Sequence, residues 1–84
     1  MLYMVIERFR SLAAAGARFL ERGRMMPEGV IYHASWMEAN GERCFQIMES
    51  AERGLLDEWM RRWEDLVEFE VVEVMTSSEF WERR

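Results

Sequence analysis

The side chains best suited to chemistry lie in one stretch of the chain, residues 30–50, which contains the only histidine, His33, and the only cysteine, Cys44. An imidazole titrates near neutral pH and can act as a general base when a substrate lies within hydrogen-bond reach. His33 is therefore the catalytic candidate. The alternative is a histidine that is hydrogen-bonded inside a dimer or half exposed to solvent.

A combined Cys–His site is not expected within one subunit. Cys44 should pair with Met37, which is four residues from His33 and therefore about 13 Å away along an extended strand. Metal ligands lie about 2 Å from their ion, and a base must touch its nucleophile. We therefore predict no metal and no cofactor, and we interpret Cys44 as a small buried residue. The alternative is a site assembled from two subunits of a dimer.

These residues belong to a predicted β-hairpin centred on Asn40-Gly41. Asn-Gly favours a type I′ turn, which needs positive φ at both central residues. With this turn, residue i faces residue 81 minus i, and each facing pair shares one side of the sheet. We expect the helices to cover the side that carries Trp36, Phe45, Ala34 and Ile47.

The opposite side of the hairpin has small polar groups set among methionines and no charged residue, so it suits neither solvent nor an ordinary core. We expect it to look away from the helices into a dimer. Ser35 should face Gln46, and the two could orient a ligand carbonyl or hydroxyl or could hydrogen-bond each other. The predicted ligand-binding residues are Tyr3, Ser35, Met37, Cys44, Gln46 and Met48.

Two glutamates could form a carboxylate pair, because Glu7 and Glu49 should lie on neighbouring strands. Glu7 also interrupts an otherwise apolar strand. The alternative is that both are strand-end surface residues paired with an arginine such as Arg8 or Arg43.

The other elements follow from hydrophobic periodicity. The strand at 2–9 is apolar on both sides, so we expect it to be central in its sheet. Ser11 is a candidate N-cap, and Ser78 could cap a short turn. The predicted elements are a strand at 2–9, helices at 11–26 and 52–67, a strand at 68–75, and a tail at 76–84 with two aromatic residues that could dock on a partner.

This order of elements, βαββαβ, predicts an α+β fold of the ferredoxin-like type, with a four-stranded antiparallel sheet and two helices on one face. The 84 residues form a single domain, 1–84. Two helices leave one sheet face open, so we expect a homodimer that buries it. The net charge of −5 argues against nucleic acid as a partner. The apolar start is too short for a membrane span or a signal peptide, and we expect a cytoplasmic protein.

Several segments resemble a family of small bacterial proteins of unknown function within the dimeric α/β-barrel superfamily. They are MLYMVIERF at the start, Ser35-Trp36, RCFQIME at 43–49, LLDEW followed by Trp63, and DLVEFEVVEV. The resemblance extends to about Ser77 and implies a ferredoxin-like subunit in a barrel-shaped dimer. It implies no established activity. The wider superfamily includes cofactor-free monooxygenases, isomerases, haem enzymes and ligand sensors, so the fold alone does not decide function.

Two functional hypotheses follow. The first is a homodimeric protein that binds a small hydrophobic molecule in an apolar pocket, either between sheet and helices or at the dimer interface. As an enzyme it would be a cofactor-free monooxygenase or isomerase with His33 as acid/base. The second is a non-catalytic binding or assembly module, in which the hairpin side with small polar groups and methionines only forms the dimer interface. A cavity of about 300 Å³ or more would favour the first hypothesis.

Overall fold

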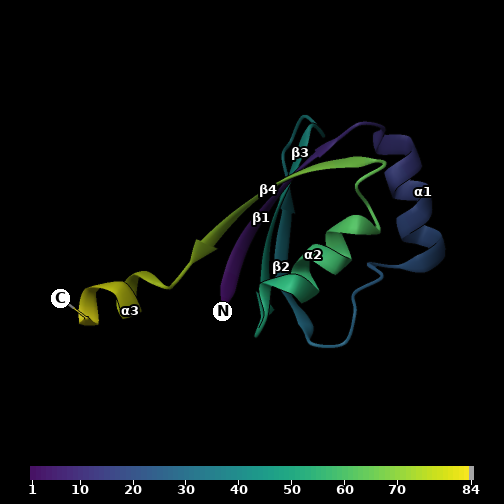
Figure 1. Ribbon diagram of the computed structural model, residues 1–84. Coiled ribbons are helices and arrows are strands. Elements are labelled where there is room, and N and C mark those ends of the chain that lie inside the picture. The colour runs from purple at the N-terminus through teal and green to yellow at the C-terminus, as the bar shows by residue number, and fades with distance from the viewer. Residues whose placement is uncertain (84) are drawn as a thin grey trace.

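The computed structural model describes residues 1–83, and their order of elements matches the ferredoxin-like prediction (Figure 1). Within these residues four antiparallel strands form one sheet in the order β2-β3-β1-β4, with β1 in the interior as expected. The elements are β1 (Leu2–Phe9), α1 (Leu12–Arg22), β2 (Val30–Met37), β3 (Arg43–Ser50), α2 (Arg53–Arg61), β4 (Val67–Val74) and α3 (Ser77–Glu82).

The helix ends are set by local hydrogen bonds. Ser11 caps α1, as predicted, by accepting from the Ala14 N–H at 3.2 Å. The helix ends earlier than predicted because Gly23 adopts φ +66° and donates to the Phe19 carbonyl at 2.7 Å. The cap of α3 is Thr76, not Ser78, since the Thr76 hydroxyl accepts from the Glu79 N–H at 3.1 Å.

The hairpin loop keeps the predicted register with a different turn. Asn40 does not adopt the positive φ that a type I′ turn requires, and Gly41 alone does so there, at +77°. Four residues, 39–42, separate Glu38 from Arg43. These two residues are joined by a backbone hydrogen bond of 2.7 Å and by a bidentate ion pair. Glu38 and Arg43 sum to 81, so this contact agrees with the predicted register.

The register then changes once, at His33. Facing residues sum to 81 from Met37–Cys44 to Ala34–Ile47, but Tyr32 faces Met48 and Ile31 faces Glu49. His33 is therefore the extra residue of a β-bulge. The predicted pairs Tyr32–Glu49 and His33–Met48 are wrong for this reason.

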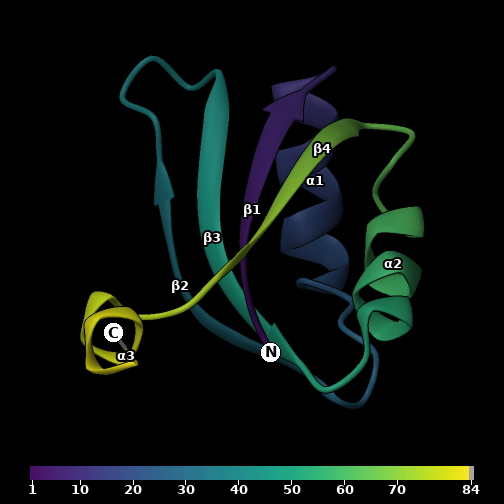
Figure 2. The ribbon, with the colours of Figure 1, turned by 60° about the vertical axis from the view of Figure 1, so that its left-hand side comes forward.

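Both α1 and α2 cover one face of the sheet, while α3 projects away from it (Figures 1 and 2). The covered face is the opposite of the predicted one. Alternate residues of β1 and β3 are buried beneath the helices, whereas Trp36 is 59% exposed on the open face. The buried positions are Tyr3, Val5, Glu7, Cys44, Gln46, Met48 and Ser50.

The core lies between the covered sheet face and α2 with the turn after it. Leu56 and Trp59 of α2 are buried, and Trp59 meets the Phe69 ring at 5.5 Å between centroids. Helix α1 is packed more loosely, with Ala15 as its buried residue. Arg18 holds α1 to the turn after α2 through a bidentate pair with Asp65 at 2.7 and 2.8 Å.

The C-terminal tail projects from the sheet as a short helix (Figure 1). The predicted docking tail, 76–84, forms α3 as far as Glu82, and Arg84 lies outside the described residues. Trp81 on α3 is 69% exposed. None of the helices in residues 1–83 has the length and apolar character needed to cross a membrane.

Two methionines predicted to share a face test this arrangement. Met48 has no exposed surface, and Met37 is 52% exposed near the end of β2. We expect Met48→Ala to lower the free energy of unfolding by about 2–5 kcal/mol, because it leaves a cavity in the core, and Met37→Ala by less than about 1 kcal/mol. Urea denaturation of both variants measures this difference, and equal losses would contradict the burial of Met48 in the core.

Candidate functional site

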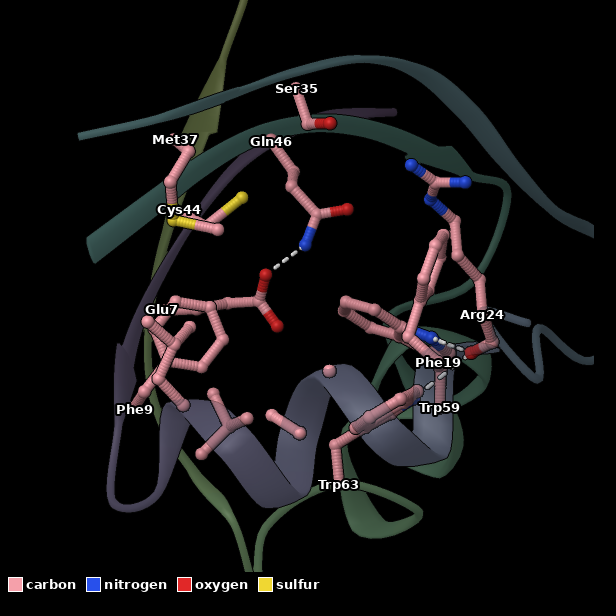
Figure 3. A pocket seen from close by; sticks show the side chains of 14 residues that line it. Glu7, Phe9, Phe19, Arg24, Ser35, Met37, Cys44, Gln46, Trp59 and Trp63 are labelled. Carbon is pink, nitrogen blue, oxygen red and sulfur yellow. Dashed lines mark hydrogen bonds between the residues drawn. The ribbon is translucent and has the colours of Figure 1, made fainter. Parts of the chain in front are cut away.

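A cavity of about 270 Å³ lies between the covered sheet face and the two helices (Figure 3). The strands contribute a polar floor, and the helices and strand ends contribute apolar walls. The floor residues are Glu7, Ser35, Cys44 and Gln46, and the aromatic wall residues are Phe9, Phe19, Trp59 and Trp63. The mixed hairpin side is thus the floor of a cavity beneath the helices and does not belong to an open face.

Glu7 is the central polar group of this cavity. It follows Tyr3 and Val5 on the covered side of β1 and is only 7% exposed. The Gln46 side-chain amide donates a hydrogen bond to one Glu7 carboxyl oxygen, and the other oxygen points into the cavity (Figure 3). Burial raises the pKa of Glu7. Hydrogen bonds from Gln46 and Cys44 and the charge of Arg24 oppose this rise without cancelling it.

Cys44 faces Glu7 across the β1–β3 ladder. Burial, the Glu7 charge and a hydrogen bond to Glu7 raise the pKa of the Cys44 thiol to about 11. Since the thiolate is the nucleophilic form, Cys44 is a poor nucleophile at neutral pH. Its place in the site is that of a small, weakly polar wall group beside the carboxyl.

Arg24 is held at the cavity by its backbone. The Arg24 carbonyl accepts hydrogen bonds from the indole N–H groups of Trp59 at 2.8 Å and Trp63 at 2.9 Å. The next residue, Met25, adopts φ +56°, an uncommon conformation for a non-glycine residue that costs about 1 kcal/mol or more. Arg62 donates to the Met25 carbonyl at 2.7 Å. Helix α2 and the turn after it thus keep the segment 24–25 in this conformation.

The predicted Ser35–Gln46 pair faces across the ladder, but the two side chains bond elsewhere. The Ser35 hydroxyl lies 2.7 Å from the Tyr32 hydroxyl, and the Gln46 amide binds Glu7. Ser35, Met37, Cys44 and Gln46 all line the cavity. The other two predicted ligand residues, Tyr3 and Met48, are fully buried in the core and do not line it.

His33, the catalytic candidate, lies outside the cavity. The bulge turns it to the open face, where its Nε2 atom lies 2.7 Å from a Glu49 carboxylate oxygen and its side chain is 44% exposed. Glu7 and Glu49 occupy opposite faces of the sheet and form no carboxylate pair. The surface alternative is wrong for Glu7, which is buried and bonded to an amide. No group of three metal-binding side chains is found in residues 1–83.

Sequence reasoning missed Arg24 and underestimated Glu7. A signal for Glu7 was present, because it shares its parity with Tyr3 and Val5 in a strand expected to be covered. No sequence signal could have identified Arg24, since its position depends on two tryptophans more than 30 residues away, at separations of 35 and 39.

The fold and the cavity define the class of this protein as a small ferredoxin-like α+β domain with a polar group buried under its helices. A family model described as a domain of unknown function (DUF3303) matches residues 1–83. The chain belongs to that family. No curated protein and no solved structure matches it significantly.

The buried carboxyl makes a prediction about pH. The folded-state pKa of Glu7 is raised above its ordinary value of 4.5, so the folded chain binds more protons than the unfolded chain above that pH. The contribution of Glu7 to stability is therefore complete below about pH 4.5 and is lost as the pH rises through the folded-state value. In this window the slope approaches ~1.4 kcal/mol per pH unit.

We expect Glu7→Gln to remove this loss while keeping the hydrogen bond from Gln46. The difference in unfolding free energy between Glu7→Gln and the unmodified chain should therefore grow as the pH rises from 4.5. Glu73→Gln, an exposed position on β4, is the matched control and should follow the unmodified chain. We measure the unfolding free energy of the three proteins by denaturation from pH 4 to pH 9. The same pH dependence in all three would contradict a raised pKa for Glu7.

Proposed function

We propose that this protein is a homodimeric small-molecule-binding protein of the dimeric α/β-barrel type, whose ligand occupies the cavity between the sheet and the helices. One observation carries the proposal: a carboxyl group is buried in a mostly apolar cavity with a neutral amide as its hydrogen-bond donor. No arginine of residues 1–83 forms an ion pair with Glu7. A buried carboxyl destabilises the chain unless it is paired, so its presence beside open space favours a functional role.

The cavity is suited to a compact hydrophobic ligand. Its volume of about 270 Å³ is slightly below the ~300 Å³ at which typical ligand pockets begin. Pockets of this kind combine an apolar lining with a few polar groups that orient the ligand. Aromatic walls with Glu7, Gln46 and Ser35 on the floor have this composition.

Of the two activities expected for an enzyme, the residues favour isomerisation. Glu7 can take a proton from a carbon next to a ligand carbonyl as a carboxylate and return it to another carbon as the acid. This sequence needs neither an oxidant nor a cofactor. Glu7 replaces His33 as the proposed acid/base, because His33 lies on the other face of the sheet. The single free thiol, Cys44, fits the predicted cytoplasmic location.

The cavity can be blocked from α1. Gly16 lines it, and a Cβ atom at this position would have no neighbour within 4 Å. We expect Gly16→Leu to fill the cavity and to weaken binding of 2-naphthol, a small neutral aromatic probe, at least about tenfold. Gly54→Leu is the matched control in α2, where a Cβ atom also meets open space but no cavity, and it should bind as the unmodified chain does.

Isothermal titration calorimetry measures these affinities, and quenching of Trp59 and Trp63 fluorescence gives a second readout. A native mass spectrum of protein purified from its own host would show any retained ligand. Equal binding by Gly16→Leu would place the ligand elsewhere. Absence of both probe binding and a retained ligand would favour the alternative, a non-catalytic assembly module.

The homodimer is supported by the open sheet face. Its middle row, Ala34, Ile47, Met4 and Val72, is uncharged and is not covered by α1 or α2. Strands of eight residues make this face about 26 Å long and, with four strands, about 19 Å wide. The footprint is roughly 500 Å² per subunit, so two copies bury about the 1,000 Å² that a specific interface needs. The projecting helix α3, with Trp81, is proposed to pack on the second copy.

A charge placed on this face should break the dimer. We expect Val72→Glu to weaken association by about 3 kcal/mol or more, over a hundredfold in Kd, because the new carboxylate would be buried without a partner. Leu20→Glu is the control, since Leu20 is 86% exposed on α1. Sedimentation velocity over a concentration series measures both variants. A dimer that survives Val72→Glu unchanged would mean that this face is not the interface.

A further inference from the structure

Arg24 gives the cavity a positive charge at the side opposite Glu7 (Figure 3). The guanidinium carbon lies 3.7 Å from the centroid of the Tyr32 ring and 5.1 Å from that of Phe19. These stacking contacts leave the edge of the guanidinium group, where its N–H donors lie, available for hydrogen bonds.

The charge has no acidic partner in the described part of the chain. Arg18, Arg43, Arg53 and Arg62 each form an ion pair with a carboxylate at 2.7–3.1 Å, whereas Arg24 forms none with any of residues 1–83. The nearest carboxyl in the cavity, Glu7, acts on Arg24 at longer range and is bonded to Gln46.

The position of Arg24 is prescribed by the fold. Its carbonyl is bound by the indole N–H groups of Trp59 on α2 and of Trp63 in the turn after it, and the next residue, Met25, is in a left-handed conformation. A guanidinium group that is anchored through its backbone, stacked on two rings and free of acidic partners is pre-organised for a carboxylate, because its fork of donors matches the two carboxylate oxygens.

We infer that the cavity binds a small aromatic carboxylate, with the carboxylate on Arg24 and an oxygen at the far end of the ring system facing Glu7. This inference rests on the proposed function, in which the cavity is the ligand site. Phe9, Phe19 and Trp63 supply flat apolar walls between the two polar ends. A volume of about 270 Å³ accommodates one or two fused rings. The neutral amide Gln46 beside Glu7 leaves Arg24 as the only full positive charge among the cavity-lining residues.

Three matched probes test the inference. 2-Naphthol is neutral, 6-hydroxy-2-naphthoate adds the carboxylate at the opposite end, and 6-hydroxy-2-naphthamide replaces that carboxylate by a neutral group of the same shape. We expect the unmodified chain to bind the naphthoate at least about tenfold more tightly than the naphthamide in calorimetric titrations. The preference should fall as the salt concentration rises.

Arg24→Met should abolish the preference for the naphthoate over the naphthamide, because Met keeps an apolar chain against Tyr32 and Phe19 but carries no charge. Arg53→Met is the matched control. Arg53 also lies over an aromatic ring, Tyr3, at 5.8 Å, but it is paired with Asp57 and does not line the cavity. It should keep the full preference.

The outcomes separate the two proposals. If 2-naphthol binds and the naphthoate and naphthamide bind equally, the cavity remains the ligand site and the anion inference fails. If no naphthalene compound binds and no ligand is retained from the host, the proposed function fails with it. Should Arg24→Met not fold, Arg24→Lys takes its place: a reduced preference supports the inference, because the charge stays and the fork is lost, and an unchanged preference overturns it.

Discussion

The alternation of side chains along β1 is the constraint on which the rest of this structure depends. β1 is an interior strand with β3 on one side and β4 on the other, so its parity decides which residues of all four strands face the helices. Tyr3, Val5 and Glu7 lie beneath α1 and α2. Because Glu7 faces Cys44, the same parity directs Cys44 and Gln46 inward and leaves Phe45 and Ile47 on the open face.

A polar centre under helices has consequences for packing. A well-filled core would leave no room beside Glu7, yet α1 buries only Ala15 and leaves a cavity at this point. The helix is held by the bidentate Arg18–Asp65 pair at its outer side, and by its N-cap. The chain thus keeps a space that apolar packing alone would close, and this space lies against its buried carboxyl.

Helix α2 and the turn after it have two roles that share the same residues. Trp59 and Trp63 bury their rings in the core and line the cavity, and their N–H groups bind the Arg24 carbonyl. A buried indole needs a hydrogen-bond acceptor, and the Arg24 carbonyl in the loop after α1 supplies it. The next residue, Met25, has the uncommon positive φ. Satisfying the tryptophans therefore also positions the cationic side of the cavity.

The amino-acid sequence by itself determined the order of the elements, the ferredoxin-like class, the interior position of β1, the register near the hairpin loop and four of the cavity residues. These follow from local patterns: apolar periodicity, capping side chains and a turn dipeptide. Only the tertiary structure decided which hairpin side meets the helices, because a period of two distinguishes the two faces without saying which one is covered. It also decided the bulge at His33, the burial of Glu7 and the place of Arg24. The covered face, the burial of Glu7 and the place of Arg24 depend on contacts between segments distant in the chain, which pairing within one hairpin cannot encode.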